Sequence, residues 1–506
     1  MRCCGMRPGS KGARIACEKG RPRCAPELHE DCADLRGAAA VALQPAALAT
    51  LERFPRDEHA KASLELALNL TLCHRAAVRS SAFAPARYVA EHAETLRLSP
   101  REIVARSGLS IDAYCGTLVE PVTNNENSLM LVEAAAWWFR PSLSVDGIAR
   151  VMIWFRIAHI ALFAWACLEA GTGALMTVLA VCGAVAVFRD VSFYQYTLYP
   201  FLSTVPLAWA AICTLIYRRL ESATLWRAVG LALAAGVTAG FGINLRTSYA
   251  PLFVGLFALA VAAAVRRGSV LTAPRLAIVS LGAFAIGASA FGQFAMRPLE
   301  HPAGAGTVNY TYHTVSHPLV MALAVPPNAL SRSEGIQWND MNNWEIAKRV
   351  KPDVSYLGPD YERTLYRYYF GLWRTRPRDM LAAYWIKLLR TGRGVFLVAS
   401  ELVPRWRWLR KVYLVWADRA NGAELLLAAA AVTAGSLFML WRSGSAIAFL
   451  ASCLATATVL LLLESSLIYS EFFPAYHSYL LYVVLIAPAA LVQAVWDLGA
   501  ARPTPR

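Results

Sequence analysis

Charged side chains are scarce in this sequence: Asp, Glu, Lys and Arg make up only 16% of 506 residues, while 57% are hydrophobic. This composition excludes an ordinary soluble protein and favours a helical protein that crosses a membrane many times. The formal net charge is +15, yet no zinc-finger or RNA-binding motif accompanies it. We therefore expect no nucleic-acid partner. We interpret the basic residues as orientation signals that also attract membrane lipids.

The 11 cysteines show neither the paired spacing of a zinc site nor a recognisable disulfide framework. Five of them crowd residues 1–35, which show no helical or strand period. The apolar residues 36–50 are interrupted by Pro45 and are too short to span a bilayer. We therefore expect residues 1–59 to be poorly ordered.

Nine later runs are apolar enough to cross a bilayer, and such runs form helices because hydrocarbon offers the backbone no hydrogen-bond partners. The runs are 151–169, 173–188, 197–217, 226–244, 247–265, 275–296, 423–441, 446–464 and 475–496. The predicted fold is an all-α polytopic membrane protein with about nine transmembrane helices. Its segments are an N-terminal segment 1–59, an outer helical segment 60–150, a six-helix bundle 151–296, a large outer loop region 297–422, and C-terminal helices with a cytoplasmic tail 423–506.

Arginines in three short loops indicate which side of the membrane is the cytoplasm. They are Arg218 and Arg219 after the third run, Arg266 and Arg267 after the fifth, and Arg442 after the seventh. If the runs alternate in direction, all of them lie on one side, which the positive-inside rule assigns to the cytoplasm. The two outer segments then lie on the opposite side. Because nothing recognisable precedes the first of them to carry it across, we expect that a first transmembrane helix is missing.

A polar, acidic stretch directly precedes the first apolar run and has the pattern of a helix start. It contains Asn125 and Glu126, and Glu133 lies two turns further along the same predicted helical face. One interpretation is a capping box, Thr123-x-x-Glu126, in which the carboxylate only binds the backbone N–H of Thr123. The other interpretation is a catalytic carboxylate that faces an outer cleft beside the membrane.

Aromatic, amide and acidic residues are interleaved within residues 309–345. A flat ring such as Trp338 stacks on a sugar, and a carboxylate such as Asp340 accepts hydrogen bonds from its hydroxyl groups. His313 and His317 are four residues apart and also fit two metal ligands on one helix face. Because no H-E-x-x-H motif accompanies them, we favour polar binding residues and predict no metal ligands. The alternative is a folded loop domain whose aromatic residues form its own small core.

Three further residues are candidates for substrate binding because of where they stand in the sequence. Arg246 lies in the outward turn between the fourth and fifth runs, where it either binds a lipid phosphate or snorkels to the interface. Lys387 belongs to a basic amphipathic stretch that we expect on the lipid headgroups or at the same phosphate. His477 stands at the outer start of the last run, where it closes the site from the far side.

Together these features resemble the GT-C class of integral-membrane glycosyltransferases, which includes protein O-mannosyltransferases and lipid A aminoarabinose transferases. Members of this class use a polyprenyl-phosphate-linked sugar and place a catalytic acid in the first outer loop. Asn125-Glu126 stands where the class usually has Asp-Glu or Asp-Asp, which leaves only Glu126 to act. Looser matches are the turn at Arg246, the loop from Trp338 to Asp340, and the start of the last run at His477.

The resemblance implies an inverting transfer of a sugar from a polyprenyl-phosphate donor to a lipid, glycan or protein acceptor, outside a bacterial inner membrane. Glu126 would be the general base, and Asp340 would orient the acceptor or assist the base. Arg246 and Lys387 would stabilise charge on the departing phosphate. The remaining predicted substrate-binding residues are Asn125, His313, His317, Trp338 and His477. No cofactor is identified, and the participation of a divalent metal ion stays open.

Two other classes of function compete with the transferase. A transporter or flippase predicts ionisable residues buried in the middle of membrane helices, and Arg156 with His159 in the first run is such a pair. A non-catalytic membrane assembly or polymer-ligation factor predicts instead that Glu126 is freely replaceable.

Overall fold

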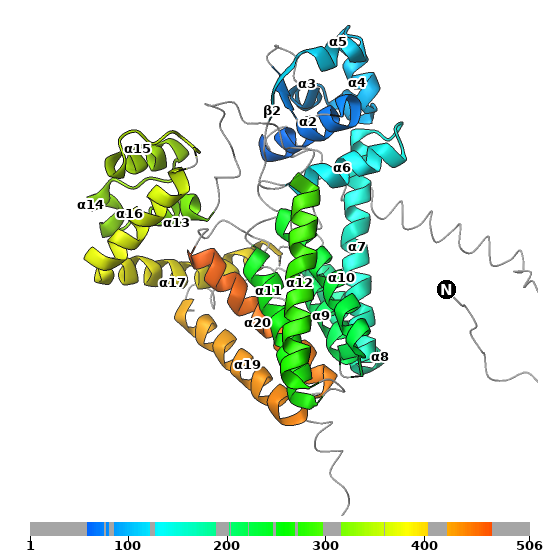
Figure 1. Ribbon diagram of the computed structural model, residues 1–506, viewed down its shortest axis with the longest axis vertical. Coiled ribbons are helices and arrows are strands. Elements are labelled where there is room, and N and C mark those ends of the chain that lie inside the picture. Colours follow the sequence, from blue (N-terminus) through cyan, green and yellow to red (C-terminus); the bar gives the residue numbers. More distant parts are fainter. Residues whose placement is uncertain are drawn as a thin grey trace, which may run out of the picture. The chain divides into compact units, whose positions relative to one another are not determined.

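Helices make up almost all of the described part of this computed structural model (Figure 1). The structure describes residues 58–74, 77–79, 85–121, 127–188, 202, 204–220, 222–245, 249–268, 272–296, 315–358, 360–402 and 422–467. The predicted N-terminal segment 1–59 and the last predicted run 475–496 lie almost wholly outside these ranges.

Short elements precede the first long apolar helix. They are α2 (Glu58–Cys73), β1 (Ala77–Arg79), α3 (Pro85–Glu91), the 3-10 helix η2 (Ala93–Arg97), α4 (Pro100–Arg106), α5 (Ile111–Gly116), β2 (Leu118–Pro121) and α6 (Asn127–Phe139). The two strands pair antiparallel. The start of α4 is encoded locally, because the Glu102 carboxylate accepts hydrogen bonds at 2.7 Å from both the backbone N–H and the hydroxyl of Ser99.

A disulfide bond between Cys73 and Cys115 joins the end of α2 to α5. The sequence indicated no disulfide framework, so this bond corrects that expectation. The two cysteines are 42 residues apart, and no short spacing motif marks the pair.

Eight further helices are long: six follow the short elements in a row, and two stand at the end of the described chain. They are α7 (Val145–Ala170), α8 (Gly173–Phe188), α9 (Val205–Leu220), α10 (Leu225–Leu245), α11 (Ala250–Arg267), α12 (Ala273–Met296), α19 (Gly422–Ser443) and α20 (Ala446–Leu467). Among the described residues, α7, α10, α11, α12 and α20 are long and apolar enough to cross a membrane. These apolar helices indicate a multi-pass membrane protein, whereas the count of nine spans stays a prediction.

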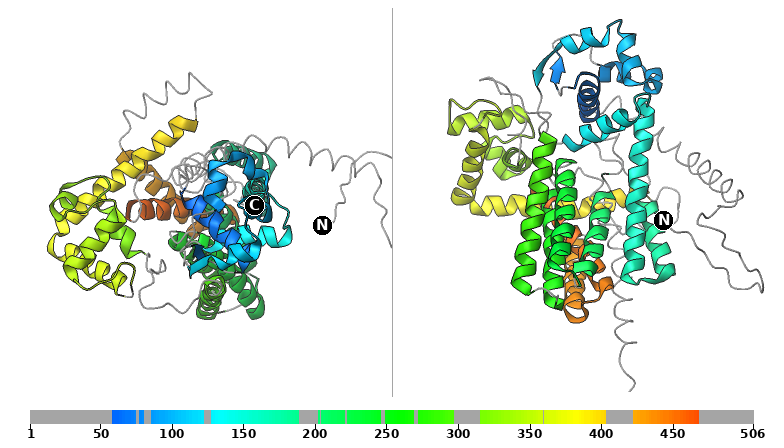
Figure 2. Two further views of the ribbon diagram at one scale, coloured as in Figure 1. Left: turned by 90° about the horizontal axis from the view of Figure 1, so that it is seen from above. Right: turned by 45° about the vertical axis from the view of Figure 1, so that its right-hand side comes forward.

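The helices α10 and α12 lie side by side (Figure 2) and approach each other through glycines. A Cβ atom on Gly236 would lie 2.2 Å from the carbonyl oxygen of Phe284, and one on Gly240 would lie 2.7 Å from that of Ala288. Across the contact, a Cβ on Gly287 would meet the Leu233 carbonyl at 2.5 Å. Small residues spaced four apart permit this close backbone packing, which replaces the hydrophobic effect as a driving force in lipid.

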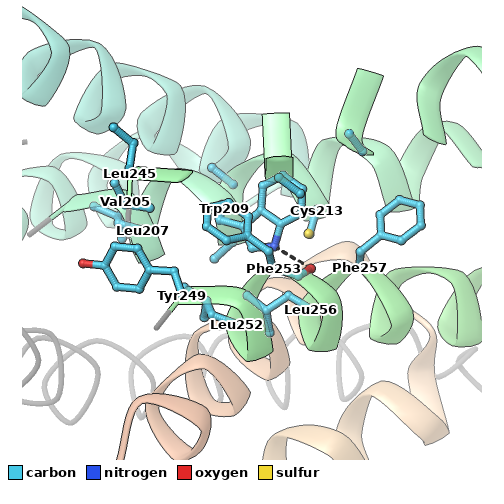
Figure 3. Close-up of a cluster of buried hydrophobic side chains, with 14 of the residues drawn as sticks. Val205, Leu207, Trp209, Cys213, Leu245, Tyr249, Leu252, Phe253, Leu256 and Phe257 are labelled. Atoms are coloured by element: carbon cyan, nitrogen blue, oxygen red, sulfur yellow. Dashed lines mark hydrogen bonds between the residues drawn. The ribbon is translucent and has the colours of Figure 1, made fainter. Parts of the chain in front are cut away.

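Aromatic residues fill the core between α9, α11 and α12 (Figure 3). The Trp209 indole N–H donates a hydrogen bond of 3.1 Å to the Phe253 carbonyl oxygen. The rings of Phe257 and Phe284 stack with centroids 4.3 Å apart. Because Trp209 is fully buried, its N–H needs such a partner.

Five helices lie within the predicted outer loop region 297–422, and after that prediction we call them the outer module. They are α13 (Ser316–Ala322), α14 (Ala329–Glu334), α15 (Asp340–Val350), α16 (Tyr361–Thr375) and α17 (Pro377–Leu402). The module has a hydrophobic core of its own, separate from the core of the membrane helices. The members of this core include Val320, Leu323, Leu330, Ile346, Leu357, Tyr361, Leu365, Met380 and Ala383.

Candidate functional site

The predicted site residues divide into those that the structure describes and those that it does not. Asn125, Glu126, Arg246, His313 and His477 lie outside the described residues. His317, Trp338, Asp340 and Lys387 are described, and all four belong to the outer module. The candidate site is therefore built from this module.

A chain of hydrogen bonds links three helices of the module through His317. Its Nε2 atom lies 3.1 Å from the Asp340 Oδ1 atom, and its Nδ1 atom lies 2.9 Å from the Tyr361 hydroxyl oxygen. The side chain of His317 is fully buried, whereas that of Asp340 is 54% exposed. The structure thus joins two predicted site residues that are 23 positions apart.

The chemistry of the partners fixes the direction of these hydrogen bonds. An ionised carboxylate only accepts, so the Nε2–H group of His317 donates to Asp340. The Nδ1 atom of that neutral ring is then an acceptor, and the Tyr361 hydroxyl donates to it. Burial raises the pKa of the Tyr361 phenol, and Tyr356 and Asp340 add to the effect, so the phenol keeps its proton. Both ring nitrogens of His317 are therefore occupied, one by Asp340 and the other by Tyr361.

Amide side chains hold the loop before Asp340 in place. The Asn339 side chain caps α15 by accepting a hydrogen bond of 2.8 Å from the Met341 N–H. Asn342 binds the loop backbone twice: it accepts from the Gln337 N–H at 2.8 Å and donates to the Gly335 carbonyl oxygen at 3.1 Å. Asn343 donates to the His317 carbonyl oxygen at 2.8 Å. Asn339 and Asn342 therefore hold the loop before Asp340, and Asn343 ties α15 to α13.

The aromatic residues of the module divide into those that belong to its core and those that are exposed. Tyr361 and Tyr369 belong to the core, and Trp344 and Tyr356 pack against it. Trp338, in contrast, is 43% exposed and stands two residues before Asp340. An exposed indole beside an exposed carboxylate is the surface on which a sugar or another polar ring could stack.

Lys387 belongs to a different group of side chains on α17. Its position continues the buried stripe of Met380, Ala383 and Tyr384, because residues three and four apart share a helical face. The side chain is only 2% exposed, and its ammonium nitrogen has no hydrogen-bond partner among the described residues. The nearest aromatic ring is Tyr384, with its centroid 5.4 Å away. The sequence placed this lysine on lipid headgroups or at a lipid phosphate; its burial argues against the first alternative, and the second stays a prediction.

Burial changes the acidity of this lysine. It lowers the pKa of Lys387 from 10.5 to about 7, because an isolated ammonium is poorly solvated inside a protein. At neutral pH the amine therefore exists in both protonation states. A buried amine without an acceptor is a ready partner for an anion that brings its own negative charge.

Ionisable residues are also buried outside the module, on the short helix α6 and on two of the membrane helices. The exposed fractions are 0% for Glu133 on α6, 8% for Arg156 on α7 and 4% for Glu464 on α20. His159 shares a hydrogen bond of 2.9 Å with the Thr204 hydroxyl and lines a largely apolar cavity of about 190 Å³ with Trp209. Groups of this kind are rare in membrane helices and usually have a functional role.

Within the described ranges, no cluster of three His, Cys, Asp or Glu side chains could hold a metal ion. Comparisons with models of known protein families, with curated proteins and with solved structures match nothing. The site must therefore be interpreted from its own chemistry. That chemistry combines an exposed carboxylate that bonds to a buried imidazole with a separate buried amine that has no acceptor among the described residues.

Sequence reasoning missed the role of Tyr361, which supports His317 from the opposite side of the ring. The hydrogen bond spans 44 residues, and a tyrosine at the start of an amphipathic helix carries no signal for such a contact. The burial of Lys387 had a weak signal, because its spacing from Met380 and Ala383 places it on their helical face.

Proposed function

We propose that this protein is a membrane glycosyltransferase that moves a sugar from a polyprenyl-phosphate donor to an acceptor at the outer side of the membrane. The observation that carries the proposal is the buried amine of Lys387. It lies on α17, the helix of the outer module that contacts the membrane helices α19 and α20. A phosphate held at the end of a lipid chain is an anion that reaches such a position.

Donor binding would complete the environment of Lys387. The phosphate diester of the donor stays anionic near neutral pH, and its charge favours the protonated amine. The lysine would then donate to the phosphate oxygens and stabilise the charge that develops as the sugar leaves. This role explains why an otherwise costly buried amine is present.

Glu126 and Asp340 are the carboxylates proposed for the chemical step. The acceptor oxygen attacks the anomeric carbon while the bond from that carbon to the phosphate oxygen breaks, and the phosphate keeps the electron pair. Glu126 takes the proton of the acceptor hydroxyl as general base. Asp340, held by His317, orients the acceptor, and Trp338 supplies a stacking face. This attack inverts the anomeric configuration.

The compartment proposed for this reaction is the outer face of a bacterial inner membrane. The Cys73–Cys115 disulfide supports an outer location for the segment before α7, because disulfides persist in oxidising compartments. The arginines at the ends of α9, α11 and α19 support the opposite side as the cytoplasm. The proposed partners are the lipid-linked donor, a lipid, glycan or protein acceptor, and membrane lipids.

Sugar transfer from a labelled polyprenyl-phosphate donor, measured in membranes, tests the proposal. We expect Glu126→Gln to lower the transfer rate by about 10²-fold or more, because it removes the base while keeping size and polarity. We expect a smaller loss for Asp340→Asn. The matched control is Asp353→Asn, which removes an exposed carboxylate of the same module, and it should transfer normally. Full activity of Glu126→Gln at normal protein abundance would show that its carboxylate only caps a helix.

A transporter or flippase is the second candidate, favoured by the buried Glu133, Arg156 and Glu464. Purified protein in liposomes distinguishes the two functions with one labelled donor. A transferase forms a new glycosidic bond, whereas a flippase moves the intact donor between leaflets. Movement without a chemical product, lost in Arg156→Gln, would favour the second candidate.

A further inference from the structure

A cavity of about 420 Å³ lies between the ends of α9, α11 and α19. These are the helix ends that the positive-inside pattern assigns to the cytoplasm, opposite to the proposed transferase site. Arg266, Arg267 and Arg442 line the cavity, and none of its described lining residues is acidic. The cavity therefore combines a concave shape with a concentrated positive charge.

The other walls of the cavity are apolar. Leu259, Ala262 and Ala263 of α11 precede Arg266 by seven, four and three residues, so all of them lie on one helical face. Leu437 of α19 lines the cavity from the other side. An apolar surface therefore runs along the membrane helices away from the arginines. A ligand that matches both parts has an anionic head and a hydrocarbon tail.

Contacts among the helices hold this cavity in shape. The Arg266 guanidinium carbon lies 3.4 Å from the centroid of the Trp441 ring, a cation–π contact that fixes the direction of the guanidinium. The Tyr217 hydroxyl donates a hydrogen bond of 2.6 Å to the Gly444 carbonyl oxygen. The Tyr217 ring also stacks on Phe449 of α20, with centroids 4.2 Å apart. The arrangement therefore exists before any ligand binds.

Orientation alone would explain arginines at these helix ends but not their arrangement around a cavity. Cations near a helix C-terminus interact favourably with the helix dipole, and cytoplasmic loops are rich in arginine. In the described part of the chain, however, neither Arg266 nor Arg442 pairs with a carboxylate, unlike Arg218, which lies 3.2 Å from Glu169. Their guanidinium groups keep several donors for an anion, and a planar fork suits a phosphate.

We propose that this cavity binds the phosphate headgroup of an anionic phospholipid from the cytoplasmic leaflet. Arg266 and Arg442 bind the phosphate, and the acyl chains lie along Leu259 and Leu437. The bilayer supplies this ligand because the cavity opens where the membrane helices end and anionic lipids attract basic residues at that surface. This inference does not depend on the proposed transferase activity.

The test uses the purified full-length protein in neutral phosphatidylcholine nanodiscs, with increasing amounts of phosphatidylglycerol. Thermal stability measures binding, and native mass spectrometry counts the retained lipids. We expect the double variant Arg266→Gln/Arg442→Gln to weaken the apparent affinity by about tenfold or more. The matched control is Arg227→Gln/Arg275→Gln, which removes the same charge from exposed positions at the starts of α10 and α12, outside the cavity. The control should bind like the wild type.

A second variant removes space and leaves the charge unchanged. Ala262→Phe places a ring against the apolar wall and should also abolish retention of the lipid. Equal losses in the cavity and control double variants would overturn the proposal, because they indicate non-specific attraction of charge. Stabilisation by soluble glycerol phosphate that Ala262→Phe leaves intact would also overturn it, by identifying a free phosphate as the ligand. Size-exclusion profiles establish that each variant is folded.

Discussion

The membrane helices and the outer module satisfy their buried polar groups in different ways. In the membrane helices, hydroxyl groups often bond to their own helix, as Thr214 does to the Ala210 carbonyl oxygen at 2.8 Å and Thr458 to that of Leu454 at 3.0 Å. In the module, buried polar groups join different elements, as His317 does with Asp340 and Tyr361. Local hydroxyl bonds and close packing are therefore prominent in the first region, although Trp209 also bonds across to α11, whereas bonds between helices hold Asp340 in the second.

This difference indicates which region is suited to chemistry. A helix whose polar groups are satisfied internally can pack against many neighbours, so it supplies a scaffold. A hydrogen-bonded chain that crosses three helices holds its end group in one orientation, as a reacting carboxylate requires.

The backbone contact between α10 and α12 at Gly236 should tolerate no larger residue. Gly236→Leu would place a Cβ atom only 2.2 Å from the Phe284 carbonyl oxygen, which is too close for any real contact, so α10 and α12 must separate. We expect a loss of about 3 kcal/mol or more in stability, measured by unfolding in detergent. Gly230→Leu on the same helix is the matched control, because nothing lies within 4 Å of its added Cβ atom. Equal stability of both variants would contradict packing by close approach.

The stability of the outer module should depend instead on the polar side chain of His317. His317→Leu removes both hydrogen bonds and leaves the buried Tyr361 hydroxyl without this partner, at a cost of about 2–3 kcal/mol. Tyr361→Phe removes one of the two bonds, keeps His317 on Asp340, and should cost about 1 kcal/mol. Only the first variant should reduce sugar transfer beyond its effect on protein abundance. Normal transfer by His317→Leu would show that the orientation of Asp340 is unimportant.

Lys387 should make the stability of the protein depend on pH. The unfolded chain keeps the lysine protonated up to about pH 10.5, whereas the folded protein releases the proton at about pH 7. The unfolded state thus binds more protons between these values, so stability should rise with pH there, and the dependence on this group should fade as the pH falls below 7. The expected gain between pH 7 and pH 8.5 is about 2 kcal/mol.

Replacing the lysine tests the origin of that pH dependence. Lys387→Met should be more stable than the wild type at pH 7, and the rise with pH should vanish. Lys348→Met removes a lysine that contacts the Trp344 ring at 3.4 Å elsewhere in the module, and it should keep the rise. A rise that persists in Lys387→Met would assign it to another group.

The membrane helices could be predicted well from the sequence, because hydropathy is a local property. The runs 226–244 and 275–296 correspond to α10 and α12 within two residues at each end. The run 197–217 overlaps α9 (Val205–Leu220), and most of its residues before Val205 lie outside the described ranges. The clustering of the α9, α11 and α19 ends, shown by Arg266 on Trp441, agrees with the predicted alternation of the runs.

The candidate site could be predicted only as a set of residue types. Asp340 and His317 were both selected, but their contact and the support from Tyr361 join separate helices and leave no local pattern. The disulfide bond between Cys73 and Cys115 likewise joins separate helices and leaves no pattern in the local sequence. Lys387 has a spacing that fits either a buried face or the lipid surface, and only the packing of the whole module decides between them.

Binding of the donor to purified protein at pH 8 tests most directly whether Lys387 receives the phosphate. Titration calorimetry in buffers of different ionisation enthalpy reports the protons taken up, and the diester phosphate of the donor does not titrate at this pH. The wild type should take up about one proton per bound donor, because the amine is largely neutral before binding and charged afterwards. Lys387→Met should bind weakly without uptake, while Lys348→Met should behave like the wild type. Unchanged affinity of Lys387→Met, with no proton taken up by the wild type, would contradict the account.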